Sequence, residues 1–299
     1  MPTTAPARTD RPSRPALVGA TAALMLVVTA LLASACSGSA QNAAAIASSA
    51  DRRAASPVVV LVHGFSPGPE GYSCADYWGR LESAFRRWDP HVKLVTVGFV
   101  RGDHDCGTRI GSDGPYTPID DIGRALAAKV YESYSSRGIP VVLVGHSMGG
   151  LIVRSAMAQA GLIGGPPFLL VPRAVTIESP HGGTNALRRC GYAECNEMAY
   201  GSAFLRRLAP DPQGRGGTVW TLFGSAGDGL VTPASATDMP VAQRYVYEHP
   251  AYNHLPIVWD ESGVTNARWR ELTTGKPITH NDVPHSLRAI FLTATGQLH

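Results

Sequence analysis

The sequence VVLVGHSMGG, residues 141–150, places an apolar run directly before a turn with a serine, Ser147, at its tip. Four consecutive apolar residues predict a buried strand, and the helix-compatible residues from Met148 onward predict a helix. Small residues on both sides of a serine let such a strand-to-helix turn tighten. The stretch therefore predicts a strand, a sharp turn that presents Ser147, and a helix.

A second Gly-x-Ser-x-Gly match, residues 64–68, also follows an apolar run, residues 58–62. Its serine, Ser66, is followed by Pro67, which has no backbone N–H to donate. A serine nucleophile in such a turn uses the N–H of the next residue to stabilise an oxyanion, and Met148 supplies that group after Ser147. We therefore predict Ser147 as the nucleophile and Met148 as one oxyanion donor.

Apolar, β-branched runs alternate with segments of helical spacing through the rest of the chain. Continuous apolar strands separated by helices predict a mainly parallel sheet covered by helices on both faces. Such sheets bind ligands at the carboxyl ends of their strands, so functional residues are expected just after the runs. The runs are residues 58–62, 92–97, 141–144, 174–177 and 218–223, and the helical segments are residues 77–88, 119–136, 148–160 and 198–208.

An acid that orients a histidine base is expected after one of the later strands. Asp228 lies in the loop after the run 218–223, where its carboxylate can accept a hydrogen bond from a histidine. An Asp-Gly pair is also typical of a plain turn, but the chain order serine, aspartate, histidine favours a catalytic Asp228. Glu178, directly after the run 174–177, is the alternative acid.

Ten histidines compete for the role of base. His254 follows Asp228 in the chain and is the predicted base. His285 begins the last helix-like segment, so we predict a helix-end residue there. His63 and His146 adjoin the turns that build the site, and we predict that their side chains hold loop geometry.

The first 56 residues predict an export signal and a tether. Arginines precede an apolar stretch, residues 16–33, that ends in small residues and Cys36, as in a secretory signal peptide. The residues before Cys36 resemble the lipobox of bacterial lipoproteins, in which the cysteine is lipidated, although Ala33 stands where that pattern usually has leucine. Simple cleavage at an Ala-x-Ala-like site and an uncleaved anchor helix are the alternatives.

We accordingly predict a lipoprotein-type signal peptide at residues 1–35, a flexible tether at residues 36–56 and one catalytic domain at residues 57–299. The protein is then expected to be exported. Its expected location is the extracellular face of the cell membrane, held there by lipid on Cys36, and secretion without an anchor is the alternative.

Five cysteines are an odd number for an exported chain. If Cys36 carries lipid, four remain, and they allow three pairings. The near neighbours Cys190 and Cys195 favour one short loop, which leaves Cys74 to pair with Cys106. A zinc site is the competing interpretation, but the spacings match no common zinc pattern.

Taken together, these residues resemble the α/β-hydrolase superfamily, and within it the secreted bacterial triacylglycerol lipases and esterases with a Gly-His-Ser-Met-Gly elbow. The resemblance spans nearly all of residues 57–299 and includes the His-Gly segment 63–65, the segment SPHGGT, the acid loop GDGLV and the base loop NHL. It implies that Phe65 is the second oxyanion donor. Glu178 departs from the small or polar residue that relatives often carry, which keeps the acid assignment open.

The resemblance implies an α/β-hydrolase fold and hydrolysis of acyl esters through an acyl-enzyme on Ser147, with no metal or organic cofactor. Its partners would be an acyl ester or lipid substrate and, through the N-terminal lipid, a membrane. A serine acyltransferase of the same fold, a peptidase and a non-catalytic binding lipoprotein are the alternatives. The formal net charge is +3, and no clustered basic face indicates nucleic acid.

Residues 187–210 lie where such folds often insert a cover over the site. The residues Met198, Leu205 and Leu208 predict an apolar helical face there. This face fits either a cover that meets substrate or an ordinary helix packed on the core, and the sequence does not separate the two.

Overall fold

The computed structural model describes residues 58–68, 70–111, 116–260, 268–272 and 276–298. The predicted signal peptide, Cys36 and the tether lie outside these ranges. Within them, no helix is both long enough and apolar enough to cross a membrane. Export and lipid attachment therefore stay predictions from the sequence.

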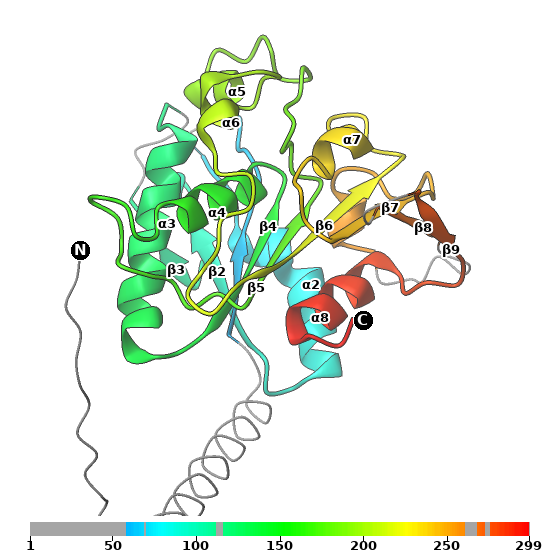
Figure 1. The fold of residues 1–299 in the computed structure, drawn as a ribbon, viewed down its shortest axis with the longest axis horizontal. Coiled ribbons are helices and arrows are strands. Elements are labelled where there is room, and N and C mark those ends of the chain that lie inside the picture. The colour runs from blue at the N-terminus through cyan, green and yellow to red at the C-terminus, as the bar shows by residue number, and fades with distance from the viewer. Residues whose placement is uncertain (1–57, 69, 112–115, 261–267, 273–275, 299) are drawn as a thin grey trace, which may run out of the picture. The chain divides into compact units, whose positions relative to one another are not determined.

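A nine-stranded sheet forms the centre of the described fold (Figure 1). The strands lie in the order β3-β2-β1-β4-β5-β6-β7-β8-β9. Neighbours from β3 to β7 pair in parallel, and β8 and β9 extend one edge in antiparallel pairing. This arrangement confirms the mainly parallel sheet predicted from the apolar runs. The strands are β1 (Val58–Val62), β2 (Lys93–Gly98), β3 (Thr108–Arg109), β4 (Val141–His146), β5 (Arg173–Ile177), β6 (Val219–Ser225), β7 (Gln243–Tyr247), β8 (Trp269–Glu271) and β9 (Ile278–His280).

Helices cover both faces of the sheet, as predicted (Figure 1). Helices α3 and α4 pack with one apolar core, and α2 and α8 pack with the other. The helices are α2 (Cys74–Trp88), α3 (Ile119–Ser133), α4 (Met148–Ala158), α5 (Ala193–Glu197), α6 (Ala203–Arg207), α7 (Pro233–Ala236) and α8 (Ser286–Thr295), with the 3-10 turns η1 (Ser135–Arg137) and η2 (Pro256–Val258).

Strand β1 shows why its sequence is apolar without alternation. Successive side chains of a strand point to opposite faces of the sheet. Val60 and Val62 belong to the core beneath α3 and α4, whereas Val59 and Leu61 belong to the core beneath α2 and α8. Because both faces of this strand are buried, every position favours an apolar residue.

The helix predicted over residues 198–208 is wrong in its extent. The structure forms only the short helix α6 there, because the chain turns at Gly201, whose φ is 66°. Ser202 then starts α6 by accepting a backbone N–H of its first turn at 3.1 Å. Met198 is nevertheless buried, so the apolar spacing reports packing rather than one continuous helix.

Two disulfides join Cys74 with Cys106 and Cys190 with Cys195, the pairs that the spacing favours. The first ties the start of α2 to the loop before β3. The second closes a short loop that ends in α5. Their Cα atoms lie 5.0 Å and 6.3 Å apart, within the range that disulfides span.

Removal of the Cys74–Cys106 disulfide, by Cys74→Ser with Cys106→Ser, is expected to lower the free energy of unfolding by about 4 kcal/mol. The same change at Cys190 and Cys195 is expected to lower it by about 2 kcal/mol. The residues of the two pairs are separated by 32 and 5 positions, and closing a longer loop restricts the unfolded chain more. Equilibrium unfolding in urea measures both losses, and an equal or larger loss at the short loop would contradict the expectation.

Candidate active site

Ser147 lies in the sharp turn between β4 and α4. Its φ of 55° and ψ of −129° fall outside the regions that non-glycine residues prefer. The Ser147 backbone N–H donates to the carbonyl of Ile177 on the neighbouring strand β5, at 2.8 Å. An unfavourable backbone conformation persists only when surrounding contacts hold it, and here it turns the serine out at the end of a buried strand.

Two glycines let the turn close. A Cβ on Gly149 would lie 2.1 Å from the carbonyl oxygen of Val62, and a Cβ on Gly145 would lie 2.5 Å from the carbonyl oxygen of Gly149. Both separations are well inside van der Waals contact, so α4 approaches β1 and β4 this closely only because the side chains are absent. The glycines of the motif are needed for packing as well as for presenting Ser147.

Three side chains from separate loops meet in one hydrogen-bonded series. The Ser147 hydroxyl donates to Nε2 of His254 at 2.9 Å, and Nδ1 of His254 donates to Oδ2 of Asp228 at 2.7 Å. The other carboxylate oxygen of Asp228 accepts the backbone N–H groups of Leu230 and Val231 at 2.7 and 3.1 Å. The series has the geometry of a nucleophile, a base and a group that orients the base.

The surroundings of Asp228 keep it charged. Burial acts to raise its pKa, but the hydrogen bond and charge of His254 and the N–H of Leu230 outweigh burial and lower the pKa. A charged carboxylate beside His254 Nδ1 fixes the proton on that nitrogen. Nε2 of His254 is therefore left without a proton and accepts the hydrogen bond of the Ser147 hydroxyl.

Glu178, the alternative acid, lies beside Asp228 rather than against His254. It is fully buried, and its backbone has a φ of 47°. Burial, followed by the charge of Asp228, raises the pKa of Glu178 well above its usual range. Among the described residues, its carboxyl oxygens make no hydrogen bond of ordinary geometry. The surroundings of Glu178 therefore favour its neutral form, next to a charged Asp228.

The loop after β1 lies against Ser147. A Cβ on Gly64 would be 3.0 Å from Ser147 Cβ and 3.4 Å from its Oγ. Within the described part of the chain, the backbone N–H groups of Phe65 and Met148 donate no hydrogen bond. The two N–H groups predicted as oxyanion donors thus belong to residues adjoining Gly64 and Ser147, and neither has a partner among the described residues.

His63 holds this loop through two buried hydrogen bonds. Its Nε2 lies 3.0 Å from Oδ2 of Asp103, and its Nδ1 lies 2.8 Å from the carbonyl oxygen of Gly64. Oδ2 of Asp103 also accepts the N–H groups of Phe99 and Val100, each at 2.7 Å. These contacts are consistent with a role of His63 in holding loop geometry. Asp103 lies 40 residues from His63 in the sequence, and no local sequence pattern around Asp103 indicates this contact.

Asp103→Asn removes the charge that faces His63. Burial acts to raise the pKa of Asp103, but His63 and nearby backbone N–H groups lower it below the usual value. Such a carboxylate stabilises the fold above its unfolded pKa, about 4, and loses that contribution as pH falls through its folded pKa. The difference in the free energy of unfolding between wild type and variant is expected to be largest near pH 7 and to shrink below about pH 4. A urea-unfolding series across this pH range tests it, and a pH-independent difference would contradict it.

The rival serine, Ser66, and the other predicted histidine, His285, make hydrogen bonds outside the series of Ser147, His254 and Asp228. Ser66 donates to the carbonyl of Gly68 at 3.4 Å, and the next helix described after it begins only at Cys74. His285 is the N-cap of α8 and accepts the N–H of Arg288 at 3.4 Å, the helix-end position expected for it.

A few side chains of the segment 187–210 pack on the core. Figure 1 shows α5 and α6 together at the top of the view, above α3 and α4. Met198 and Leu208 are buried in the core that includes α3 and α4. Glu197 of α5 accepts the N–H of Ile119 at 2.6 Å, which ties the segment to the first residue of α3. These apolar side chains face the core, so the packed-helix alternative describes them.

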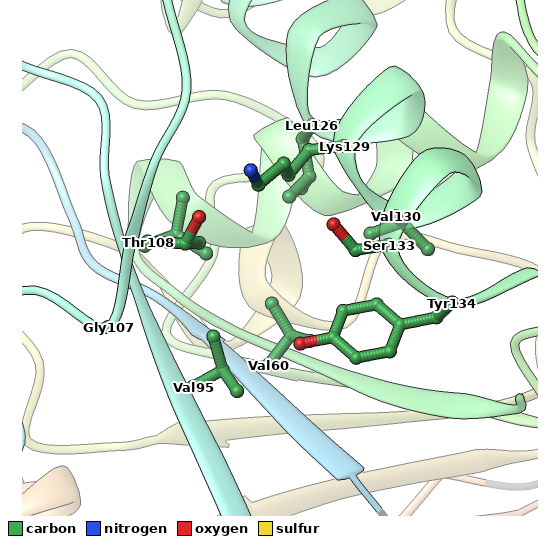
Figure 2. A pocket seen from close by; sticks show the side chains of 10 residues that line it. Val60, Val95, Gly107, Thr108, Leu126, Lys129, Val130, Ser133 and Tyr134 are labelled. Atoms are coloured by element: carbon green, nitrogen blue, oxygen red, sulfur yellow. The ribbon is translucent and has the colours of Figure 1, made fainter.

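Two cavities lie in the described part of the chain, and neither is lined by Ser147, Asp228 or His254. Figure 2 shows a cavity of about 190 Å³ between α3 and the strands β1 and β2, and none of the three hydrogen-bonded site residues lines it. A second cavity, of about 320 Å³, reaches Leu255, the residue after His254, and therefore adjoins the base loop. The second cavity is lined by Gly71, Tyr72, Ser73, Asp76, Tyr77, Leu255 and Trp259.

The described residues include no group of three or more His, Cys, Asp or Glu side chains placed to hold a metal ion.

Comparison with known proteins gives a family match. The family model described as "Alpha/beta hydrolase family" matches residues 59–295. A search of curated proteins gives no match. Among solved structures, the chain is similar to the mature lipase BlEst2 of Bacillus licheniformis, with 18% identity over 69% of this chain and 87% of that one and a TM-score of 0.48.

Two further solved structures show comparable similarity. The product of the gene lin2722 from Listeria innocua is 12% identical over 80% of this chain and 93% of that one, with a TM-score of 0.47. Lipase B of Aspergillus fumigatus is 15% identical over 69% of this chain and 50% of that one, with a TM-score of 0.45. Scores of this size support no inference about activity.

Proposed function

Because the chain belongs to the alpha/beta hydrolase family, we propose that it hydrolyses carboxylic esters with Ser147 as the nucleophile. One observation carries the proposal: the hydrogen-bonded series from Ser147 through His254 to Asp228. The backbone N–H groups of Phe65 and Met148, which donate to no other described residue, support it as the oxyanion donors.

In the first half of the reaction, Nε2 of His254 takes the hydroxyl proton of Ser147 as Oγ bonds to the ester carbonyl carbon. The N–H groups of Phe65 and Met148 donate to the carbonyl oxygen as it becomes negative, and each contributes about 3 kcal/mol in the transition state. His254 then gives the proton to the alcohol oxygen as the C–O bond breaks. The alcohol leaves, and the acyl group remains on Ser147.

In the second half, water replaces the alcohol. His254 takes a proton from water as the water oxygen bonds to the acyl carbon, and the same N–H groups hold the oxyanion. The proton then returns to Oγ of Ser147 as the acyl bond breaks, and the acid is released. The charge of Asp228 stabilises the imidazolium that forms twice in each cycle.

The proposed substrate is an acyl ester or a lipid. The cavity next to His254 supports an apolar group on the substrate, because Tyr72, Tyr77, Leu255 and Trp259 contribute to its lining. Export with lipid on Cys36 belongs to the same proposal. The two disulfides support an oxidising compartment, since such bonds persist outside the reducing cytosol.

Ser147→Ala is expected to lower the rate of p-nitrophenyl ester hydrolysis by at least about a thousandfold, because no other group forms the acyl-enzyme. Ser66→Ala is the matched control from the second Gly-x-Ser-x-Gly match and is expected to stay within about twofold of wild type. Initial rates on esters of increasing acyl length compare the variants and define chain preference. A comparable loss of rate in Ser66→Ala, or substantial activity left in Ser147→Ala, would contradict the assignment of Ser147 as the nucleophile.

Asp228→Asn is expected to lower kcat by about ten-thousandfold, because an amide at this position favours the wrong tautomer of His254. Glu178→Gln replaces a carboxyl group whose raised pKa favours the neutral form by an amide of similar size, and it is expected to stay within about tenfold of wild type. Steady-state kinetics on one ester compare the two variants. The reverse order of losses would transfer the acid role to Glu178.

A further inference from the structure

A second hydrogen-bonded series adjoins the proposed triad. The Gly64 N–H donates to the hydroxyl of Tyr77 at 3.0 Å, and this hydroxyl lies 2.5 Å from Nδ1 of His146. Nε2 of His146 lies 2.6 Å from the carbonyl oxygen of His254. The series begins in the loop that carries Phe65, passes through the residue before the nucleophile and ends on the backbone of the base. It therefore touches three parts of the site and uses none of the reacting atoms.

Every proton in this series has one consistent place. The backbone N–H of Gly64 only donates and the carbonyl of His254 only accepts, so Nε2 of His146 carries a proton. Burial, followed by the charge of His254, lowers the pKa of His146 to about 3. The ring is therefore neutral at pH 7, and its Nδ1 accepts the hydroxyl proton of Tyr77. All donors point the same way, from Gly64 towards His254.

The series is closed to solvent. His146 is fully buried and Tyr77 is 6% exposed. Burial also raises the pKa of Tyr77, so its hydroxyl keeps its proton. A buried donor or acceptor that loses its partner costs about 1–3 kcal/mol. The three loops are thus held at fixed separations.

We propose that Tyr77 and His146 are positioning residues that keep the oxyanion loop and the backbone of His254 in register with Ser147. This role rests on the proposed function, because it is defined relative to the nucleophile and the base. Without the Tyr77 hydroxyl, the N–H of Gly64 and Nδ1 of His146 lose their partners together. A displacement of about 1 Å in a reacting group can cost about a hundredfold in rate.

Tyr77→Phe removes one oxygen and keeps the ring, which packs 5.0 Å from Trp78 between ring centroids. Tyr247→Phe is the matched control. Tyr247 is fully buried in the same apolar core, and its hydroxyl donates to the carbonyl of Pro284 at 2.8 Å, outside the site. A comparison of Tyr77→Phe with Tyr247→Phe distinguishes the effect of losing any buried hydroxyl group from the effect of breaking the series through Tyr77 and His146.

The first measurement is the rate at which a fluorophosphonate labels Ser147. Labelling needs the nucleophile, the base and the oxyanion donors, but it does not depend on which ester is the natural substrate. The second is kcat and KM for a p-nitrophenyl ester. Tyr77→Phe is expected to lower both the labelling rate and kcat by about 10- to 100-fold and to leave KM within about twofold. Tyr247→Phe is expected to match wild type in both.

A second pair of variants covers the case in which Tyr77→Phe does not fold. His146→Gln places an amide that can accept from Tyr77 and donate to the carbonyl of His254, whereas His146→Phe offers neither group. His146→Gln is expected to label at least about tenfold faster than His146→Phe. Equal labelling rates in the two folded variants of either pair, or a loss confined to KM, would overturn the positioning role.

The same measurements separate the two proposals. Wild-type protein that is labelled at Ser147 but hydrolyses no ester overturns the proposed function, while the labelling rates of the variants still decide the positioning role. Wild-type protein that is not labelled at all overturns both, because Ser147 is then not an activated nucleophile.

Discussion

The positive φ of Ser147 is the constraint on which the site depends. It persists because Ile177 binds the Ser147 N–H and because Gly149 lets α4 press against the carbonyl of Val62. The parallel register places Val62 opposite Gly145 and Ile177 opposite His146, so three neighbouring strands end at the same level. The loops that follow these strands therefore meet around one hydroxyl group, and the other site residues need only short loops to reach it.

The groups around His254 differ in charge because their surroundings differ. Asp228 accepts three hydrogen bonds and stays ionised, whereas burial beside that charge raises the pKa of Glu178 well above its usual range. Burial likewise keeps His146 neutral and Tyr77 protonated. His254 thus faces one formal charge, at Nδ1, and its Nε2 accepts the hydrogen bond of the Ser147 hydroxyl. Because their surroundings shift the pKa values of these neighbouring groups in different directions, each group favours one protonation state.

The sequence predicts those parts of the structure whose signal is local. The strands β1 and β4 follow from apolar runs buried on both faces, and the meeting of Ser147, Asp228 and His254 follows from a turn motif and chain order. The strands β3, β8 and β9 are two or three residues long, and their pairing depends on neighbours distant in sequence. Tyr77 looks like any core residue of an amphipathic helix, because its partner His146 is 69 positions away. Contacts of that kind become visible only once the chain is folded.

During turnover of an ester, Ser147 is expected to carry the acyl group. Rapid acid quenching of the protein soon after mixing with a slowly released p-nitrophenyl ester, followed by mass spectrometry of its peptides, detects that intermediate directly. The predicted result is one acyl mass on the peptide that contains Ser147. Release of p-nitrophenol in a burst with the acyl mass on the Ser66 peptide, or on no peptide, would contradict the proposed mechanism.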